Sequence, residues 1–256
     1  MVRMLTTSSI DFGYPWWLSY GHLAVLVFAL VALFVGRALK WSTWVMAALG
    51  LLVVWAGAAF FVVRSFDVNG QPVLLTQSFL RSGVGRVLDL GAGTGRSSIM
   101  VLAARPQATL VALDLFDQSF ERHFGSHGSP QEWLLANLKA AGVDRRASIE
   151  TADMRHLPFE AASFDAIVSA YAIDHLGREG AKEALAEAGR VIKPGGDFLL
   201  ILVANDGWTK FAFGPLLSHG GTRGANWWRE RVSEAGFEVV EQGAAPATLY
   251  FLLRRS

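Results

Sequence analysis

A glycine-rich stretch in the middle of the chain carries the clearest chemical signal. Residues 87–98 read Val-Leu-Asp-Leu-Gly-Ala-Gly-Thr-Gly-Arg-Ser-Ser, an apolar run with one acid that leads into a turn and a helix. Glycines let the backbone approach a ligand closely, and the following helix presents unpaired N–H groups at its start. The sequence therefore predicts a ligand-binding turn at Gly91, Gly93 and Gly95, with Asp89 just before it.

A second acid follows at a spacing that suits a nucleoside. Asp114 ends the next predicted strand, residues 108–113, about 20 residues beyond the turn, where a carboxylate can accept both hydroxyls of a ribose. The glycine spacing, G-x-G-x-G, differs from the G-x-G-x-x-G of dinucleotide sites. We predict ribose binding by Asp114, with helix capping as the alternative.

Strand and helix patterns alternate from residue 86 onward and position these residues, which predicts an α/β fold. The predicted strands are residues 86–90, 108–113, 147–151, 163–171, 197–203, 237–241 and 248–253. The predicted helices are residues 96–104, 130–141, 178–190 and 224–235. Because no helix separates the last two strands, they can form an antiparallel pair at one edge of a seven-stranded sheet.

This pattern resembles the class I S-adenosylmethionine (SAM) methyltransferases, which have a Rossmann-like sheet. The likeness covers about residues 72–256 and rests on the glycine stretch, Asp114, residues 152–159 and the turn at 193–196, Lys-Pro-Gly-Gly. It implies SAM as cofactor. Asp153 would accept the adenine amino group beside Met154, and Asp89 would lie at the amino-acid end. The predicted cofactor-binding residues are Asp89, Gly91, Ala92, Gly93, Thr94, Gly95, Asp114, Leu115, Asp153, Met154 and Ser169.

The end of the fourth predicted strand faces the methyl group in the resembled family. Tyr171, Asp174 and His175 stand there and are the predicted catalytic residues. An imidazole can take a proton from the acceptor, and Asp174 can orient it or bind a cation. The alternative is that this pair only starts the following helix and positions the cofactor.

The first 63 residues differ in composition from the rest. They hold only four of the 45 charged side chains: Arg3, Asp11, Arg37 and Lys40. Residues 12–36 and 41–63 carry no charge, and about 20 apolar residues cross a bilayer core of about 30 Å. We predict spans at about 16–36 and 42–63. Aromatic side chains that suit the interfacial layer stand near the ends: Tyr14, Trp16, Trp17, Tyr20, Trp41 and Trp44.

The predicted organisation is a transmembrane hairpin (1–63), a connector helix (64–85, in which Pro72 could start the helix) and a methyltransferase domain (86–256). A buried helical pair in a soluble fold and a cleaved signal are the alternatives to the hairpin. The few charges near the spans do not decide the orientation. Because SAM is made in the cytosol, we expect an integral membrane protein with its catalytic domain on the cytoplasmic side.

Composition excludes several kinds of chemistry. The chain has no cysteine, which excludes disulfides and thiolate catalysis. A net charge of +1 and the lack of a basic, aromatic-rich patch argue against nucleic acid. His123 and His127 have a helical metal-ligand spacing, but the glycines beside them and the lack of cysteine make us expect no metal. The sequence makes no prediction about oligomeric state.

The resulting hypothesis is a membrane-anchored SAM-dependent methyltransferase acting on a small or lipophilic acceptor near the bilayer surface. An apolar loop, residues 208–221, would form the acceptor wall through Phe211, Phe213, Leu216 and Leu217. One alternative is a protein methyltransferase acting on a membrane partner. Another is a non-catalytic SAM-binding protein with an assembly role in the membrane.

Overall fold

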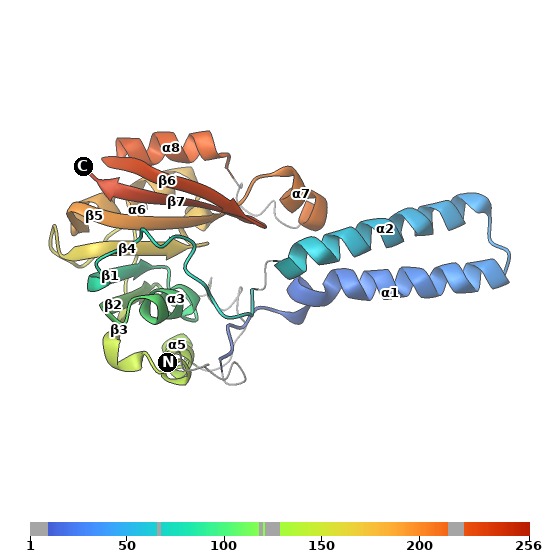
Figure 1. The fold of residues 1–256 in the computed structure, drawn as a ribbon, viewed down its shortest axis with the longest axis horizontal. Helices are drawn as coiled ribbons and strands as arrows, with labels where there is room; N and C mark the ends of the chain where they lie inside the picture. The colour runs from blue at the N-terminus through green and yellow to red at the C-terminus, as the bar shows by residue number, and fades with distance from the viewer. Residues whose placement is uncertain (1–9, 66–67, 118–119, 121–128, 215–222) are drawn as a thin grey trace.

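The computed structural model describes residues 10–65, 68–117, 120, 129–214 and 223–256. The expectations for His123, His127, Leu216 and Leu217 concern residues outside these ranges. The described chain forms an α/β domain from which a long helical hairpin projects (Figure 1).

A single sheet of seven strands organises the α/β domain, in the order β3-β2-β1-β4-β5-β7-β6. The strands are β1 (Val84–Leu90), β2 (Gln107–Asp114), β3 (Ala147–Thr151), β4 (Phe164–Ala170), β5 (Ile192–Val203), β6 (Phe237–Ala245) and β7 (Thr248–Arg255). Strands β1 to β5 are parallel, whereas β7 is antiparallel to both β5 and β6. The predicted seven-stranded sheet with its antiparallel pair is confirmed.

Helices cover both faces of the sheet because neighbouring residues of a strand point to opposite sides. Leu88 of β1 belongs to the core under α6 (Gly177–Val191) and α8 (Ala225–Glu234). Val87 belongs to the opposite core, under α3 (Arg96–Ala104) and α5 (Pro130–Ala140). The near-continuous apolar runs of the central strands follow from this burial on both faces.

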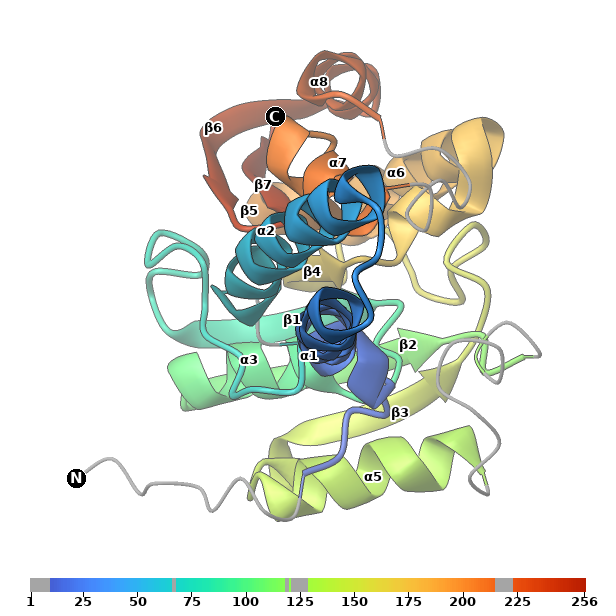
Figure 2. The same ribbon diagram turned by 90° about the vertical axis from the view of Figure 1, so that its right-hand side faces the viewer.

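The hairpin consists of α1 (Trp16–Ala38) and α2 (Thr43–Ser65), each 23 residues long. Both helices are long and apolar enough to cross a membrane, and only 11% of the most apolar window of each is buried. Large apolar side chains are exposed along them, including Phe34 (78%) and Phe61 (77%). The hairpin is therefore not a buried helical pair inside the domain. Figure 2 looks along it and shows both helices in front of the sheet.

The segment before α1 belongs to the α/β domain, whereas we predicted that residues 1–63 form the hairpin alone. Phe12 is 3% exposed and belongs to the core beside α3 and α5. Asn137 of α5 binds both backbone groups of Asp11, accepting from its N–H (3.0 Å) and donating to its carbonyl (2.6 Å). Residues 10–14 thus pack as part of the α/β domain although they precede the hairpin.

The predicted connector helix at 64–85 is also wrong within the residues described. Helix α2 continues to Ser65, and residues 68–83 contain turns. The Arg105 guanidinium donates to the carbonyls of Phe79 and Gln77, at 2.8 Å each from Nη2. Because side chains of the domain hold these backbone groups, a local helix does not form.

Helix α7 (Gly207–Phe213) replaces the first part of the predicted apolar loop. The Asp206 carboxylate caps it by accepting from the N–H of Thr209 at 2.7 Å. An aspartate at this position is a sequence signal for a helix start that our prediction overlooked. The helix follows β5 and lies beside α2 (Figure 2).

The packing of Phe12 predicts that Phe12→Ala destabilises the α/β domain. We expect a loss of about 3 to 5 kcal/mol in the free energy of unfolding, because a fully packed ring leaves a cavity. Denaturant unfolding in detergent micelles, followed by near-ultraviolet circular dichroism, measures it. Val84→Ala, at a side chain 54% exposed, is the control and should change stability by less than about 0.5 kcal/mol. Equal effects of the two substitutions would show that residues 10–14 are not part of the domain core.

Candidate functional site

The glycine turn lies at the carboxyl edge of the sheet, between β1 and α3. The N–H groups of Gly91 and Ala92 both donate to the carbonyl of Leu113, at 2.9 and 3.0 Å. Gly91 has φ +78°, and a Cβ there would lie 2.3 Å from that of Ala172. This position therefore requires glycine both for its backbone conformation and for the close approach of the segment after β4.

Asp114 meets this turn from the neighbouring strand. Its Oδ2 accepts from the N–H of Gly93 at 2.9 Å and its Oδ1 from the N–H of Phe116 at 3.1 Å. Burial raises the pKa of this carboxyl, and the backbone N–H donors oppose the shift. Each carboxylate oxygen can accept more than one hydrogen bond. Asp114 thus fits the predicted ribose role, and the next side chain, Leu115, is 42% exposed.

Asp153 and Met154 follow β3, next to Asp114. The N–H of Ala152 donates to the carbonyl of Asp114 at 3.1 Å, which joins the two strand ends. Arg155 holds both oxygens of Asp153, with Nη2 2.6 Å from Oδ2, and its hydrogen bonds lower the pKa of Asp153. Met154 Cε lies 3.0 Å from the Cβ position of Gly91. The structure therefore brings both residues to the turn and adds Arg155, which our prediction lacked.

Asp89 lies beneath the turn and is fully buried. Its Oδ2 accepts from the hydroxyls of Ser97 (2.7 Å) and Ser98 (2.6 Å) in the first turn of α3. Its Oδ1 has no hydrogen-bond partner among the residues described. Burial raises the pKa of Asp89 to about 7, although the two hydroxyls oppose the shift. Asp89 thus ties β1 to α3 and does not reach the surface of the turn.

Two of the predicted cofactor-binding residues use their hydroxyls for hydrogen bonds inside the protein. The Thr94 hydroxyl donates to the carbonyl of Phe12 at 3.0 Å, and that of Ser169 donates to the carbonyl of Leu90 at 2.8 Å. Thr94 is 2% exposed and Ser169 is fully buried. Both hydroxyls join parts of the protein, because a buried hydroxyl needs a partner. Motif spacing and strand alternation do not show which partner a buried hydroxyl takes.

The predicted catalytic residues follow β4. Tyr171 has φ +54°, a strained conformation for a tyrosine, and its N–H donates to the carbonyl of Ile201 at 2.8 Å. Its hydroxyl lies 2.7 Å from Thr248 Oγ1, and burial raises its pKa. Because Ala172 touches Gly91, this segment directly adjoins the glycine turn.

Asp174 and His175 lie on the short helix η3 (Ile173–Leu176) but in different surroundings. Asp174 is 9% exposed, and its Oδ2 accepts from the N–H of Val203 at 3.2 Å, while His175 is exposed. Burial raises the pKa of Asp174, and the charges of His175 and Arg223 oppose the shift. Asp174 therefore provides a buried carboxyl and His175 an accessible imidazole.

Several buried polar atoms have unmet hydrogen-bonding capacity, among them one on Arg223, whose charge acts on Asp174. Asp174 Oδ1, Thr209 Oγ1 and Arg223 Nη1 are buried and have no partner among the residues described. The Arg223 guanidinium also stacks on Trp227, 4.6 Å from the ring centroid. Buried polar atoms without partners are costly, so such atoms at a strand edge point to a ligand. Our sequence prediction did not include Arg223, because nothing in its spacing links it to residue 174.

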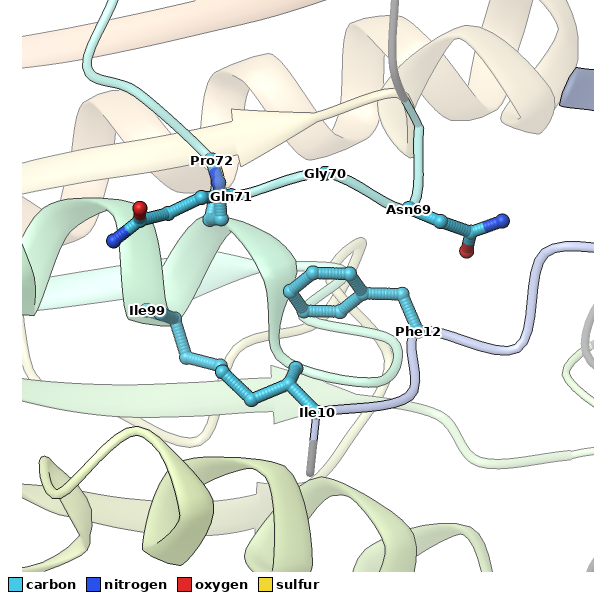
Figure 3. Close-up of a pocket in the computed structure, with 7 residues that line it drawn as sticks. All are labelled: Ile10, Phe12, Asn69, Gly70, Gln71, Pro72 and Ile99. Carbon is cyan, nitrogen blue, oxygen red and sulfur yellow. The ribbon is translucent and has the colours of Figure 1, made fainter. Parts of the chain in front are cut away.

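A small apolar hollow lies away from these residues (Figure 3). Its lining residues are Ile10, Phe12, Asn69, Gly70, Gln71, Pro72 and Ile99. None of the predicted cofactor or catalytic residues lines it. The hollow marks where the segment before α1 and the segment after α2 meet over α3. Among the described residues, no cluster of three or more His, Asp or Glu side chains could hold a metal ion.

The geometry agrees with comparisons to known proteins. Residues 87–196 match a family described as a methyltransferase domain. A ubiquinone/menaquinone biosynthesis C-methyltransferase UbiE from Syntrophotalea carbinolica is 31% identical over 120 residues, 47% of this chain and 44% of the relative. A demethylmenaquinone methyltransferase from Deinococcus radiodurans is 33% identical over 116 residues, 45% of this chain and 42% of the relative. The match thus spans less than half the length of these relatives.

Solved structures show the same fold. An O-methyltransferase family protein from Burkholderia thailandensis gives a TM-score of 0.60 at 18% identity, covering 93% of this chain and 71% of the other. Residues 87–196 therefore match a methyltransferase domain, and this match together with the fold implies SAM as the cofactor. The glycine turn and Asp114 fit such a ligand at this edge.

Replacing Asp114 tests the predicted ribose contact. Asp114→Ala should weaken SAM binding roughly 10- to 100-fold, because each hydrogen bond to a charged group contributes about 1.5 to 3 kcal/mol. Isothermal titration calorimetry measures the affinity, with Glu238→Gln, at an exposed carboxylate of β6, as the matched control. Unchanged affinity in Asp114→Ala would refute the assignment.

The raised pKa of Asp89 predicts a pH-dependent stability. The folded protein holds the proton of Asp89 up to about pH 7, whereas the unfolded chain, in which the carboxyl has its ordinary pKa of 3.8, releases it at lower pH. The free energy of unfolding should therefore fall between pH 4 and pH 7, by up to about 1.4 kcal/mol per pH unit from this group. Asp89→Asn should remove that slope. Parallel pH profiles for the two proteins would contradict the buried, protonated carboxyl.

Proposed function

We propose that this chain is a membrane-anchored SAM-dependent methyltransferase that transfers a methyl group to a lipophilic acceptor at the bilayer surface. One observation carries the proposal: the hairpin leaves the domain at the edge that holds the glycine turn (Figure 1). Thr94, in the turn, is hydrogen-bonded to Phe12, a few residues before α1 begins. A lipid-soluble acceptor would therefore meet the site close to the surface of the membrane.

The surface of the hairpin supports membrane anchoring. Each helix of 23 residues is about 34 Å long at about 1.5 Å per residue, enough for a hydrocarbon core of about 30 Å. Helices that are apolar all round are stable when buried or in lipid, and these are not buried. Trp16 and Trp17 stand at the end near the domain, and Trp41 and Trp44 at the far end, as in interfacial belts.

We place the catalytic domain on the cytoplasmic side, where SAM is made. Both ends of the hairpin join the same α/β domain, through Phe12 before α1 and through residues 68–83 after α2. A two-helix anchor then needs only one domain on one side of the membrane. The acceptor is inferred by analogy. The two relatives above are named for quinone synthesis and for demethylmenaquinone, and we propose a lipid-soluble acceptor of this quinone type.

The predicted cofactor-binding residues and the predicted catalytic residues would have separate roles. The glycine turn, Asp114, Asp153 and Met154 would hold SAM, which when bound supplies a methyl group on a positively charged sulfur that leaves readily. The rest of the task is to place the acceptor in line, exclude water and remove a proton. His175 is exposed on η3, which follows Ala172, and would take that proton on its imidazole. The buried carboxyl of Asp174 would then stabilise the imidazolium by its charge.

Transfer of a labelled methyl group tests the function. Purified protein in vesicles that contain lipid extract from cells lacking the gene, given tritium-labelled SAM, should label the organic extract. Asp114→Ala should abolish labelling at low SAM concentration. His175→Gln should lower the turnover rate about 10²- to 10⁴-fold without changing SAM affinity.

Other distributions of label would overturn the proposal. Label confined to precipitated protein, when whole membranes replace the lipid extract, would indicate a protein methyltransferase. SAM binding with no label in any fraction would indicate a non-catalytic protein. A His175→Gln variant with full turnover would leave His175 a positioning role only.

A further inference from the structure

Helix α7 is joined to both helices of the hairpin by hydrogen bonds at its last turn. The indole N–H of Trp55, in α2, donates to the carbonyl of Phe211 at 2.9 Å. Nε2 of His22, in α1, lies 2.6 Å from the carbonyl of Ala212. Carbonyls in the last turn of a helix lack partners within the helix. Side chains of the hairpin therefore complete the end of α7.

Apolar packing strengthens this contact. Ala212 of α7 is 1% exposed and forms a small core with Ala59 and Val63 of α2. The His22 ring packs edge-on against Trp55 and Phe213, with centroids 5.3 and 6.1 Å away. Figure 2 shows α7 lying directly beside α2. The contact runs along α2 from Trp55 to Val63, within the part predicted to span the bilayer.

The length of α2 decides whether this contact lies in water or in lipid. Trp55 lies about 15 Å along the helix axis from Ser65, at about 1.5 Å per residue. If the membrane surface lay beyond Trp55, the spanning part would shrink to Thr43–Trp55. That is roughly 13 residues and 20 Å, too short for a core of about 30 Å. A spanning α2 therefore carries α7 below the membrane surface.

The outer face of α7 suits that position. Trp208 is 66% exposed and Phe211 39% exposed, and their rings pack edge-on 6.1 Å apart. Lys210 between them is also exposed. A lysine can place its charge at the interface while its stem lies against apolar surface. The face thus continues the apolar surface of the hairpin onto the catalytic domain.

We infer that α7 is inserted into the bilayer, with Trp208 and Phe211 in contact with acyl chains. The inference rests on the proposed membrane anchoring and deepens it. Helix α7 follows β5, whose last residue, Val203, donates its N–H to Asp174. Helix α7, at the rim of the predicted site, would therefore lie within the lipid. The acceptor would reach the site along α7 from inside the bilayer, without crossing water.

The absence of native cysteine makes a site-specific test direct. Trp208→Cys carries a nitroxide label, and the full chain is reconstituted in vesicles of phosphatidylcholine and phosphatidylglycerol. Power-saturation electron paramagnetic resonance compares the accessibility of the label to oxygen, which concentrates in lipid, and to a water-soluble nickel chelate. Val54→Cys in α2 (69% exposed) is the membrane reference, and Val240→Cys in β6 (46% exposed) is the aqueous reference.

We expect the label at 208 to show a raised ratio of oxygen to nickel accessibility, towards that at 54 and away from that at 240. A ratio at 208 equal to that at 240, with a lipid-like ratio at 54, would overturn the inference and leave the anchor intact. Aqueous ratios at both 54 and 208 would overturn the anchor as well. SAM binding confirms that each variant is folded. Phe211→Cys repeats the test on the same face if Trp208→Cys does not fold.

Discussion

The hydrogen bonds that hold the segment before α1 against the glycine turn are the constraint on which the rest of this structure depends. Asn137 fixes Asp11, and Thr94 fixes Phe12, so α1 starts from the edge of the sheet where the cofactor residues gather. A hairpin attached by a loose linker would leave its orientation relative to the domain undefined. Here the attachment uses a side chain of the glycine turn, because the Thr94 hydroxyl donates to the carbonyl of Phe12, so the hairpin and the turn are held together.

The site shows two different uses of buried carboxyl groups. Asp89 is fully buried and accepts hydrogen bonds from two serine hydroxyls, which connect α3 to β1. Asp174 has one oxygen on a backbone N–H and the other without a partner among the residues described. Burial raises the pKa of both. The difference lies in their neighbours, because Asp174 stands behind an exposed imidazole and near a guanidinium that also has unmet hydrogen-bonding capacity.

The carboxyl edge of the sheet is joined to the hairpin at two places, beside β1 and after β5. Beside β1 the connection is made by hydrogen bonds from the side chains of Thr94 and Asn137 and by the packing of Phe12, whereas after β5 it is made by α7. The carbonyls at the end of α7 are bonded by Trp55 and His22, so one short helix contacts both α1 and α2. A methyl acceptor dissolved in lipid would lie between these two attachments. This arrangement gives a physical reason for joining a methyltransferase domain to a hairpin by more than a tether.

The sequence by itself determined the parts that depend on local pattern. Apolar runs, turns and glycine spacing predicted the strands, the antiparallel pair, the two long helices and the position of Asp114, because each of these is encoded within a short stretch. The resemblance to a known family added Asp153. Contacts between distant residues were decided only by the tertiary structure. It placed Phe12 in the core, turned Thr94 and Ser169 inward, set Arg155 on Asp153, and replaced a connector helix with a segment held by Arg105. These contacts depend on which distant residues become hydrogen-bond or packing partners in the folded chain, and the spacing of residues along the sequence does not show that.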